Sequence, residues 1–162
     1  MYDNFGPEFV NIEWTEMFLG FYRDNAGERP FISQQQQFKL QLMTQNTKDI
    51  TNQIIEAITD KKGKKITLID LSDIESAPTG QLVICQGGST AQVGAIADSI
   101  RDGVQRATGI KPVNYDGYRN CQWIVIDYGN VMVHVFLPDI RQFYSLETLW
   151  NDAPVREIPD LD

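Results

Sequence analysis

The only histidine in the chain, His134, is the residue whose type most readily suggests chemistry. It lies in an apolar stretch, residues 123–136 (WIVIDYGNVMVHVF), which also contains Asp127. A histidine and an aspartate on one pair of strands could activate a water molecule. The sequence offers no second histidine or nearby cysteine to complete a zinc site, and no nucleophile beside the pair. We therefore expect His134 to serve packing or partner binding, with no metal and no catalytic residue.

The second pattern is the glycine turn GGST at residues 87–90, which follows an apolar run and precedes a helical pattern. It resembles the entry of nucleotidyltransferases, in which a helix N-terminus faces phosphate and two later carboxylates hold magnesium. Here Asp98 is followed two residues later by Ile100, and Asp102 lies one helical turn on, where both acids should face solvent. The metal ligands are therefore missing and no cofactor is predicted. A degenerate nucleotidyltransferase or a nucleotide-binding protein that uses this turn stays the alternative function.

The composition is that of one globular domain. The chain has 162 residues, of which 42% are hydrophobic and 22% charged, and its net charge is −8. This acidity disfavours strong direct binding to nucleic acid, which needs clustered Lys and Arg, and favours a basic protein as partner. No apolar run approaches the roughly 18 residues of a membrane span. The two cysteines, Cys85 and Cys121, lie in apolar settings and indicate buried thiols in a reducing cytoplasm.

Residues 123–136 predict a β-hairpin with a two-residue loop at 129–130 (Gly-Asn), a dipeptide that tolerates the positive φ values of a tight turn. This loop places Trp123 opposite Phe136. Because side chains alternate along a strand, one face of the hairpin is aliphatic core together with Tyr128. The opposite, polar–aromatic face carries Trp123, Val125, Asp127, Met132, His134 and Phe136.

Isoleucines at helical spacing predict a helix over residues 47–60. The lysine-rich sequence KKGKK at residues 61–65 should end it, with Gly63 as the exit residue. These lysines could touch RNA, but the acidity of the whole chain favours a solvated helix end. Residues 66–71 predict the first strand, which a loop follows.

The nearly continuous apolar run at residues 82–86 predicts a buried central strand. A helix should follow, because Ser89 and Gln92 have the spacing of a capping box and Gly109 comes at its end. A short strand is expected near residues 112–115. This order of strand, helix and strand predicts a βαβ crossover, and hence a single α/β domain with a mixed sheet flanked by helices.

The two ends of the chain differ from its middle. Residues 1–42 contain scattered aromatics without helical or strand period, and predict an extension unless the start codon has been assigned too far upstream. Residues 43–153 predict the α/β domain, in which residues 139–144 should form a turn and Ser145 should cap a short helix. Residues 154–162 are expected to be a frayed acidic tail.

Two blocks in the second half of the chain carry a resemblance to a known family. The first, W-x-x-x-D-x-G-x-V-x-V-H-V, begins at Trp123, and the second, R-x-x-Y-x-L-E-x-L-W, begins at Arg141. With the VIC and GS motifs of residues 83–89, they make residues 47–152 similar to the iojap-like ribosomal silencing factors. The resemblance implies a nucleotidyltransferase-like α/β fold without the catalytic carboxylates, which agrees with the missing acid at position 100.

The resemblance also implies a function and partners. Members of the family bind ribosomal protein fourteen of the large ribosomal subunit, which blocks joining of the small subunit and represses translation when nutrients are scarce. Free members include homodimers. We therefore expect a non-enzymatic, cytoplasmic translational repressor that acts sterically. Its expected contact surface comprises Trp123, Asp127, Tyr128, Met132, His134, Phe136, Arg141, Tyr144, Glu147 and Trp150.

Overall fold

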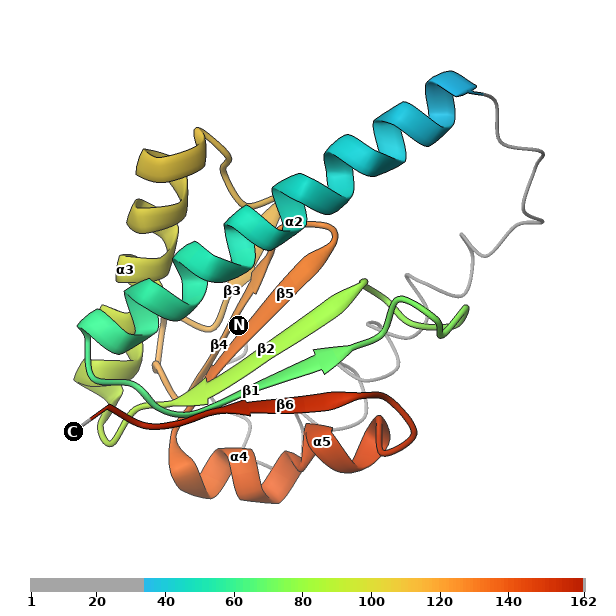
Figure 1. The fold of residues 1–162 in the computed structure, drawn as a ribbon. Coiled ribbons are helices and arrows are strands. Elements are labelled where there is room, and N and C mark those ends of the chain that lie inside the picture. The colour runs from blue at the N-terminus through green and yellow to red at the C-terminus, as the bar shows by residue number, and fades with distance from the viewer. Residues whose placement is uncertain (1–33, 162) are drawn as a thin grey trace.

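The fold is built on a mixed sheet with helices on both faces, as the computed structural model shows for residues 34–161 (Figure 1). The predicted fold class is confirmed. The six strands have the order β3-β4-β5-β2-β1-β6, and only β2 and β5 are parallel neighbours. The strands are β1 (Lys64–Asp70), β2 (Gln81–Gln86), β3 (Asn114–Asp116), β4 (Trp123–Asp127), β5 (Val131–Phe136) and β6 (Val155–Ile158). The helices are α2 (Gln34–Asp60), α3 (Thr90–Thr108), α4 (Pro138–Tyr144) and α5 (Leu146–Leu149).

The hairpin of β4 and β5 has the predicted register. Trp123 lies opposite Phe136 and Val125 lies opposite His134. The backbone N–H of Tyr128 donates to Val131 O across the turn. Gly129 alone takes a positive φ, of 87°, which only a residue without a Cβ adopts at no steric cost. The sequence pattern therefore set both the hairpin and the separation of its two faces.

Helix α3 begins and ends as predicted. The N–H of Gln92 donates to Ser89 Oγ at 3.1 Å, and Gly109 ends the helix in the left-handed region with φ 73°. The strand that follows, β3, lies at the edge of the sheet and pairs only with β4. In the sheet, β5 and β4 lie between β2 and β3, so the crossover from β2 through α3 to β3 passes two strands. The parallel neighbour of β2 is β5.

The helix before the lysines is longer than expected and ends differently. It begins at Gln34 rather than at residue 47, so it crosses the expected boundary at residue 42. Its first part is rich in Gln and also contains Lys, Leu and Met, all of which have a high helix propensity. The left-handed exit residue is Lys62, with φ 58°, so the role given to Gly63 was wrong. Gly63 is required for space, because a Cβ there would lie 2.5 Å from Ile58 Cγ2.

The segment after the hairpin also differs from its prediction. Residues 139–144 belong to helix α4 rather than to a turn, because Pro138 at the first helical turn has the fixed φ that starts a helix. The side chain of Ser145 does not accept the N-cap hydrogen bond predicted for α5. Ser145 takes φ 45° and donates its N–H to Arg141 O, so it ends α4 before α5 begins.

The tail after residue 153 is not frayed as expected. Its strand β6 pairs antiparallel with β1, with Val155 opposite Ile69 and Ile158 opposite Ile66. Pro154 and Pro159 flank the strand, which is compatible with an edge position where one side needs no partner. The sheet therefore includes residues that the predicted domain left out. The expectations about residues 1–33, including the alternative start, lie outside the described residues.

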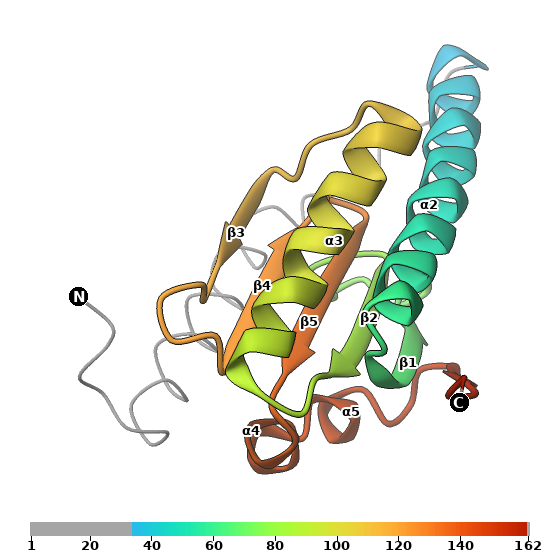
Figure 2. The ribbon, with the colours of Figure 1, turned by 90° about the vertical axis from the view of Figure 1, so that its left-hand side faces the viewer.

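The sheet separates two hydrophobic layers. Helices α2 and α3 lie side by side over one face (Figure 2) and bury an almost wholly aliphatic cluster that includes Ile54, Ile96 and Ile100. Helices α4 and α5 close the other face over a smaller cluster. Its buried members are Ile69, Leu71, Leu82, Ile84, Val125, Met132, Phe136 and Ala153.

Candidate partner-binding surface

The polar–aromatic face of the hairpin is covered by α4. Trp123 connects the two, because its ring lies 5.0 Å from that of Phe136 in the sheet and 4.7 Å from that of Tyr144 on α4. The indole N–H of Trp123 donates to His134 Nδ1 at 3.0 Å. Tyr144 in turn meets Phe143 edge-on at 5.1 Å between ring centroids. A continuous series of aromatic rings therefore leads from the core to the surface of α4.

His134 has the properties of a core residue. It is 3% exposed, and its burial lowers the pKa of the imidazole to about 3. The ring is therefore neutral near pH 7, with Nδ1 as acceptor for Trp123. Asp127 lies at the turn end of β4, where its carboxylate accepts the N–H of Gly129 at 2.7 Å. The arrangement supports the packing interpretation of the histidine over water activation.

Arg141 fixes α4 on the sheet. Its Nε and Nη2 lie 2.9 and 2.7 Å from Glu147 Oε1, so that the pair joins α4 to α5. Its Nη1 donates to Lys65 O at 2.7 Å and its Nη2 donates to Thr67 Oγ1 at 3.0 Å. These bonds to β1 hold two helices that are too short to be stable alone.

The structure divides the ten expected contact residues into three groups. Met132, His134 and Phe136 are buried beneath α4 and support the surface from below. Tyr128 is 8% exposed and packs in the cluster under α2 and α3, on the other face of the sheet. The half-buried residues, which reach the surface, are Trp123, Asp127, Arg141, Tyr144, Glu147 and Trp150.

Two apolar residues were missed by the sequence analysis. Phe143 on α4 is 51% exposed and Leu149 on α5 is 59% exposed. Pro138 followed by Asp139 is a typical helix start and could have indicated that Phe143 lies on a helix. We define the α4–α5 surface as Trp123, Phe143, Tyr144, Leu149 and Trp150.

The GGST turn uses its polar groups internally. The N–H of Gly88 donates to Gln92 Oε1 at 2.7 Å, and the N–H of Gln92 donates to Ser89 Oγ. Asp98 and Asp102 are exposed on α3, as expected. Helix capping therefore accounts for the sequence of this turn.

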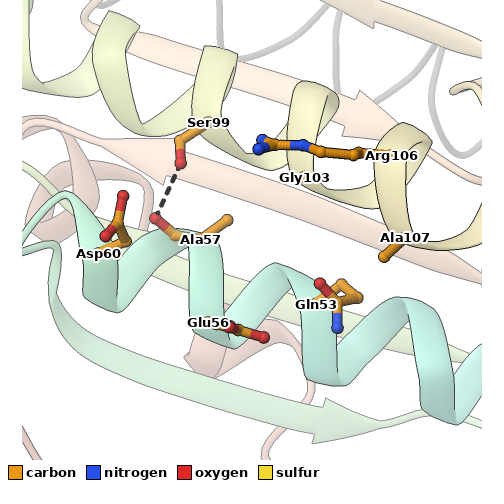
Figure 3. Close-up of a pocket in the computed structure, with 8 residues that line it drawn as sticks. All are labelled: Gln53, Glu56, Ala57, Asp60, Ser99, Gly103, Arg106 and Ala107. Atoms are coloured by element: carbon orange, nitrogen blue, oxygen red, sulfur yellow. Dashed lines mark hydrogen bonds between the residues drawn. The ribbon is translucent and has the colours of Figure 1, made fainter.

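A groove of about 370 Å³ lies between α2 and α3 (Figure 3). Ser99 Oγ donates to Ala57 O at 3.2 Å across its floor. Its rim carries both signs of charge, from Glu56, Asp60 and Arg106. Across residues 34–161, no group of three or more His, Cys, Asp or Glu residues could hold a metal ion. None of the helices in this range is both long and apolar enough to cross a membrane.

Both cysteines are free thiols in this structure. Cys85 is buried in β2, and burial raises the pKa of its thiol to about 12. Cys121 is half-buried in the loop before β4, and burial also raises its pKa. Both thiols are therefore protonated near pH 7, which suppresses the thiolate that nucleophilic chemistry would need.

Comparison with known proteins assigns the chain to a family. The family described as "Ribosomal silencing factor during starvation" matches residues 44–162. The ribosomal silencing factor of Bacillus subtilis is 37% identical over 113 residues, which cover 70% of this chain and 94% of that protein. The factor of Halalkalibacterium halodurans is 38% identical over 104 residues, which cover 64% of this chain and 87% of that protein. The chain belongs to the ribosomal silencing factor family.

Solved structures agree with this assignment. A crystal structure of a protein from Chromobacterium violaceum is 36% identical, with a TM-score of 0.61, and the match covers 64% of this chain and 85% of that chain. The chloroplastic protein Iojap of Zea mays is also similar, at 36% identity over 77 residues, which cover 48% of this chain and 33% of that protein. The resemblance to iojap-like factors is thus confirmed.

Proposed function

We propose that the protein represses translation by binding the large ribosomal subunit through ribosomal protein fourteen and hindering the joining of the small subunit. Membership in the ribosomal silencing factor family supports ribosome association and repression in general terms. The partner, the steric mechanism, the absence of enzymatic activity and a cytoplasmic location are our proposals. The homodimer that the resemblance implies stays a prediction, which analytical ultracentrifugation of the free protein tests.

The observation that carries the proposal is the exposure of large apolar side chains on the α4–α5 surface. Phe143 and Leu149 project from helices that the Arg141 network holds in place. Half-buried Trp123 and Trp150 pack against the hydrophobic cluster beneath these helices. Aromatic residues on a rigid support are typical anchors of protein interfaces, since little conformational freedom is lost when they bind.

Charge favours a basic partner at this surface. The chain carries a net charge of −8, and the exposed acids Asp139 and Asp152 lie on α4 and just after α5. Glu147 is already engaged by Arg141, and Asp127 accepts an N–H in its own turn. We therefore assign the long-range attraction of a basic ribosomal protein to the exposed acids rather than to Asp127 and Glu147.

Binding to purified large subunits tests the proposal. The double variant Phe143→Ala, Leu149→Ala should bind at least about 30-fold more weakly, because losing even one interface anchor costs about 2 kcal/mol. Val113→Ala is the matched control, since Val113 is 76% exposed and precedes β3, at the other end of β4 from Trp123. Equal binding by the double variant and the wild type would remove the α4–α5 surface from the interface.

A further inference from the structure

The turn between α2 and β1 concentrates positive charge in an acidic protein. Four of the fourteen Lys and Arg residues of the chain lie within residues 61–65, whereas Asp and Glu number twenty-two overall. Lys61, Lys62 and Lys65 are exposed and Lys64 is half-buried. We call this segment the lysine turn.

The backbone of the lysine turn is fixed by its neighbours. Lys62 and Lys65 both adopt left-handed φ values, of 58° and 50°. The side-chain amide of Gln92, at the start of α3, donates to the carbonyl oxygens of Lys61 and Lys62, each at 3.1 Å. The N–H of Gly63 donates to Ile58 O. The lysine side chains therefore extend from a preorganised turn rather than from a loose loop.

Capping of α2 does not account for these lysines. The carbonyl oxygens of Ile58 and Thr59 accept the N–H groups of Gly63 and Lys62, and those of Lys61 and Lys62 accept the side-chain amide of Gln92. Lys61 Nζ meets Asp60 at 3.8 Å, and Lys64 Nζ donates to Leu161 O. Within residues 34–161, no ion pair engages the ammonium groups of Lys62 and Lys65. These charges are available to a partner.

The acidic groups near the lysine turn leave it a net positive charge. Asp60 pairs with Lys61, and Asp160 accepts the backbone N–H of Lys65 at 2.7 Å. Four lysines against two acids still favour an anion. The N-terminal end of α3 lies beside the turn through Gln92, and its helix dipole adds positive potential.

The lysine turn adjoins helix α4, which carries part of the α4–α5 surface. Arg141 on α4 donates from Nη1 to Lys65 O at 2.7 Å. The end of α2, the start of α3 and helix α4 lie at the same end of the sheet (Figures 1 and 2). A partner seated on α4 and α5 would thus bring its neighbouring surface to the lysines.

We propose that the lysine turn contacts the phosphate backbone of ribosomal RNA beside the protein site on the large subunit. This rests on the proposed function, which supplies the ribosomal surface. Lysine ammonium groups act as point charges, and their neutralisation of phosphates releases counterions. The net charge of −8 opposes binding to free RNA, so the contact forms only once docking of the α4–α5 surface holds the turn close to RNA.

Salt dependence of binding to purified large subunits tests the contact. The variant Lys61→Gln, Lys62→Gln, Lys65→Gln should reduce the slope of log affinity against log potassium chloride concentration by about 2, since each phosphate contact contributes about 0.7 to 0.9. The control Lys48→Gln, Arg106→Gln, Lys111→Gln removes the same charge from exposed positions on α2, on α3 and beyond α3. It should leave the slope unchanged. Equal slopes for all three proteins would overturn the proposal.

Directed cleavage separates RNA from an acidic protein surface as the partner. In a Cys121→Ser background, an iron chelate attached through Lys62→Cys produces hydroxyl radicals that cut any RNA backbone close to it. We expect ribosomal RNA to be cut at one site, and the same chelate on Lys111→Cys to leave that site intact. Binding without cleavage from position 62 would overturn the RNA contact alone. Failure of the wild-type protein to bind large subunits would overturn the proposed function as well.

Discussion

The two faces of the sheet are covered in different ways. Helices α2 and α3 cover one face over an aliphatic cluster in which Ile54, Ile96 and Ile100 are fully buried. Helices α4 and α5, of seven and four residues, cover the other face, where the rings of Trp123, Phe136 and Tyr144 pack beside aliphatic side chains. The polar groups of Arg141 on α4 and His134 on β5 make specific hydrogen bonds there. We call the two faces the aliphatic face and the aromatic face. The first face has regular helices and simple packing. The second depends on specific contacts and leaves apolar side chains exposed.

This difference separates stability from recognition. Burial of aliphatic side chains stabilises the fold in proportion to the apolar area removed from water and needs no particular geometry. It is therefore suited to a face that does not bind a partner. Aromatic residues that are half-buried can pack against the core and still meet a partner. We infer that substitutions under α2 and α3 change stability alone, whereas substitutions at α4 and α5 change binding.

The largest effect is expected on the aliphatic face. Ile100→Ala should lower the free energy of unfolding by about 2 to 5 kcal/mol, because it removes buried methyl groups and leaves a cavity. Urea unfolding followed by circular dichroism measures this change. The folded fraction should bind large subunits with wild-type affinity. A loss of affinity that persists after correction for folding would contradict the separation of the two faces.

Trp123→Ala should affect both properties, because the indole lies in the core and on the α4–α5 surface. Affinity for large subunits should fall by about 2 kcal/mol or more, as for an interface anchor. Stability should also fall by at least about 2 kcal/mol, since an aromatic ring is lost against Phe136 and Tyr144. Binding and unfolding are measured on the same preparation. Unchanged affinity of the folded variant would place Trp123 in the core only.

Acid should lower the free energy of unfolding of the protein through His134, which is buried on the aromatic face. The pKa of His134 is about 3 in the folded protein and near 6.5 when unfolded, so the unfolded state takes up a proton that the folded state excludes. This contribution is fully present above the unfolded pKa and declines as the pH falls below it. Between about pH 7 and pH 5 it should cost about 2 kcal/mol of stability.

A variant without the imidazole isolates that contribution. The stability difference between wild type and His134→Phe, measured by urea unfolding, should shift by about 2 kcal/mol between the same two pH values, with the wild type losing more. Other titrating groups are common to both proteins and cancel in the difference. A constant difference would show that His134 accepts a proton in the folded state.

The smallest effect is expected at the start of α3. Ser89→Ala should lower the free energy of unfolding by about 1 kcal/mol, because the N–H of Gln92 loses its acceptor. Thermal unfolding measures the change, and affinity for large subunits should stay unchanged. Saturable binding of nucleoside triphosphate with magnesium by the wild type, lost in Ser89→Ala, would instead support the nucleotide-binding alternative.

The aliphatic face could be predicted from the sequence because its helices are long enough to show a period. The cap of α3 at Ser89 and its end at Gly109 both match the structure, and isoleucines at helical spacing predicted the second half of α2. The hairpin register was equally determined, since the loop at Gly129 fixes every pair in β4 and β5. Local rules were sufficient wherever one face is buried over several turns or strand residues.

The aromatic face could not be predicted in the same detail. Helices α4 and α5 are too short for a periodic signal, and contacts of Arg141 with Lys65 and Thr67, far away in sequence, hold them. The strand β6 is likewise fixed by pairing with β1 rather than by its own pattern. The sequence analysis placed Trp123, Tyr144 and Trp150 on the expected contact surface, which stays a prediction, but it assigned Phe143 to a turn and missed its exposure.

The central claim is most directly tested by measuring subunit joining. Light scattering follows the association of purified large and small subunits in the presence of the protein. Wild type added at saturating concentration should suppress joining, whereas Phe143→Ala, Leu149→Ala should leave it close to the level without protein. Val113→Ala should act as the wild type does. Full joining in the presence of bound wild-type protein would contradict the steric account.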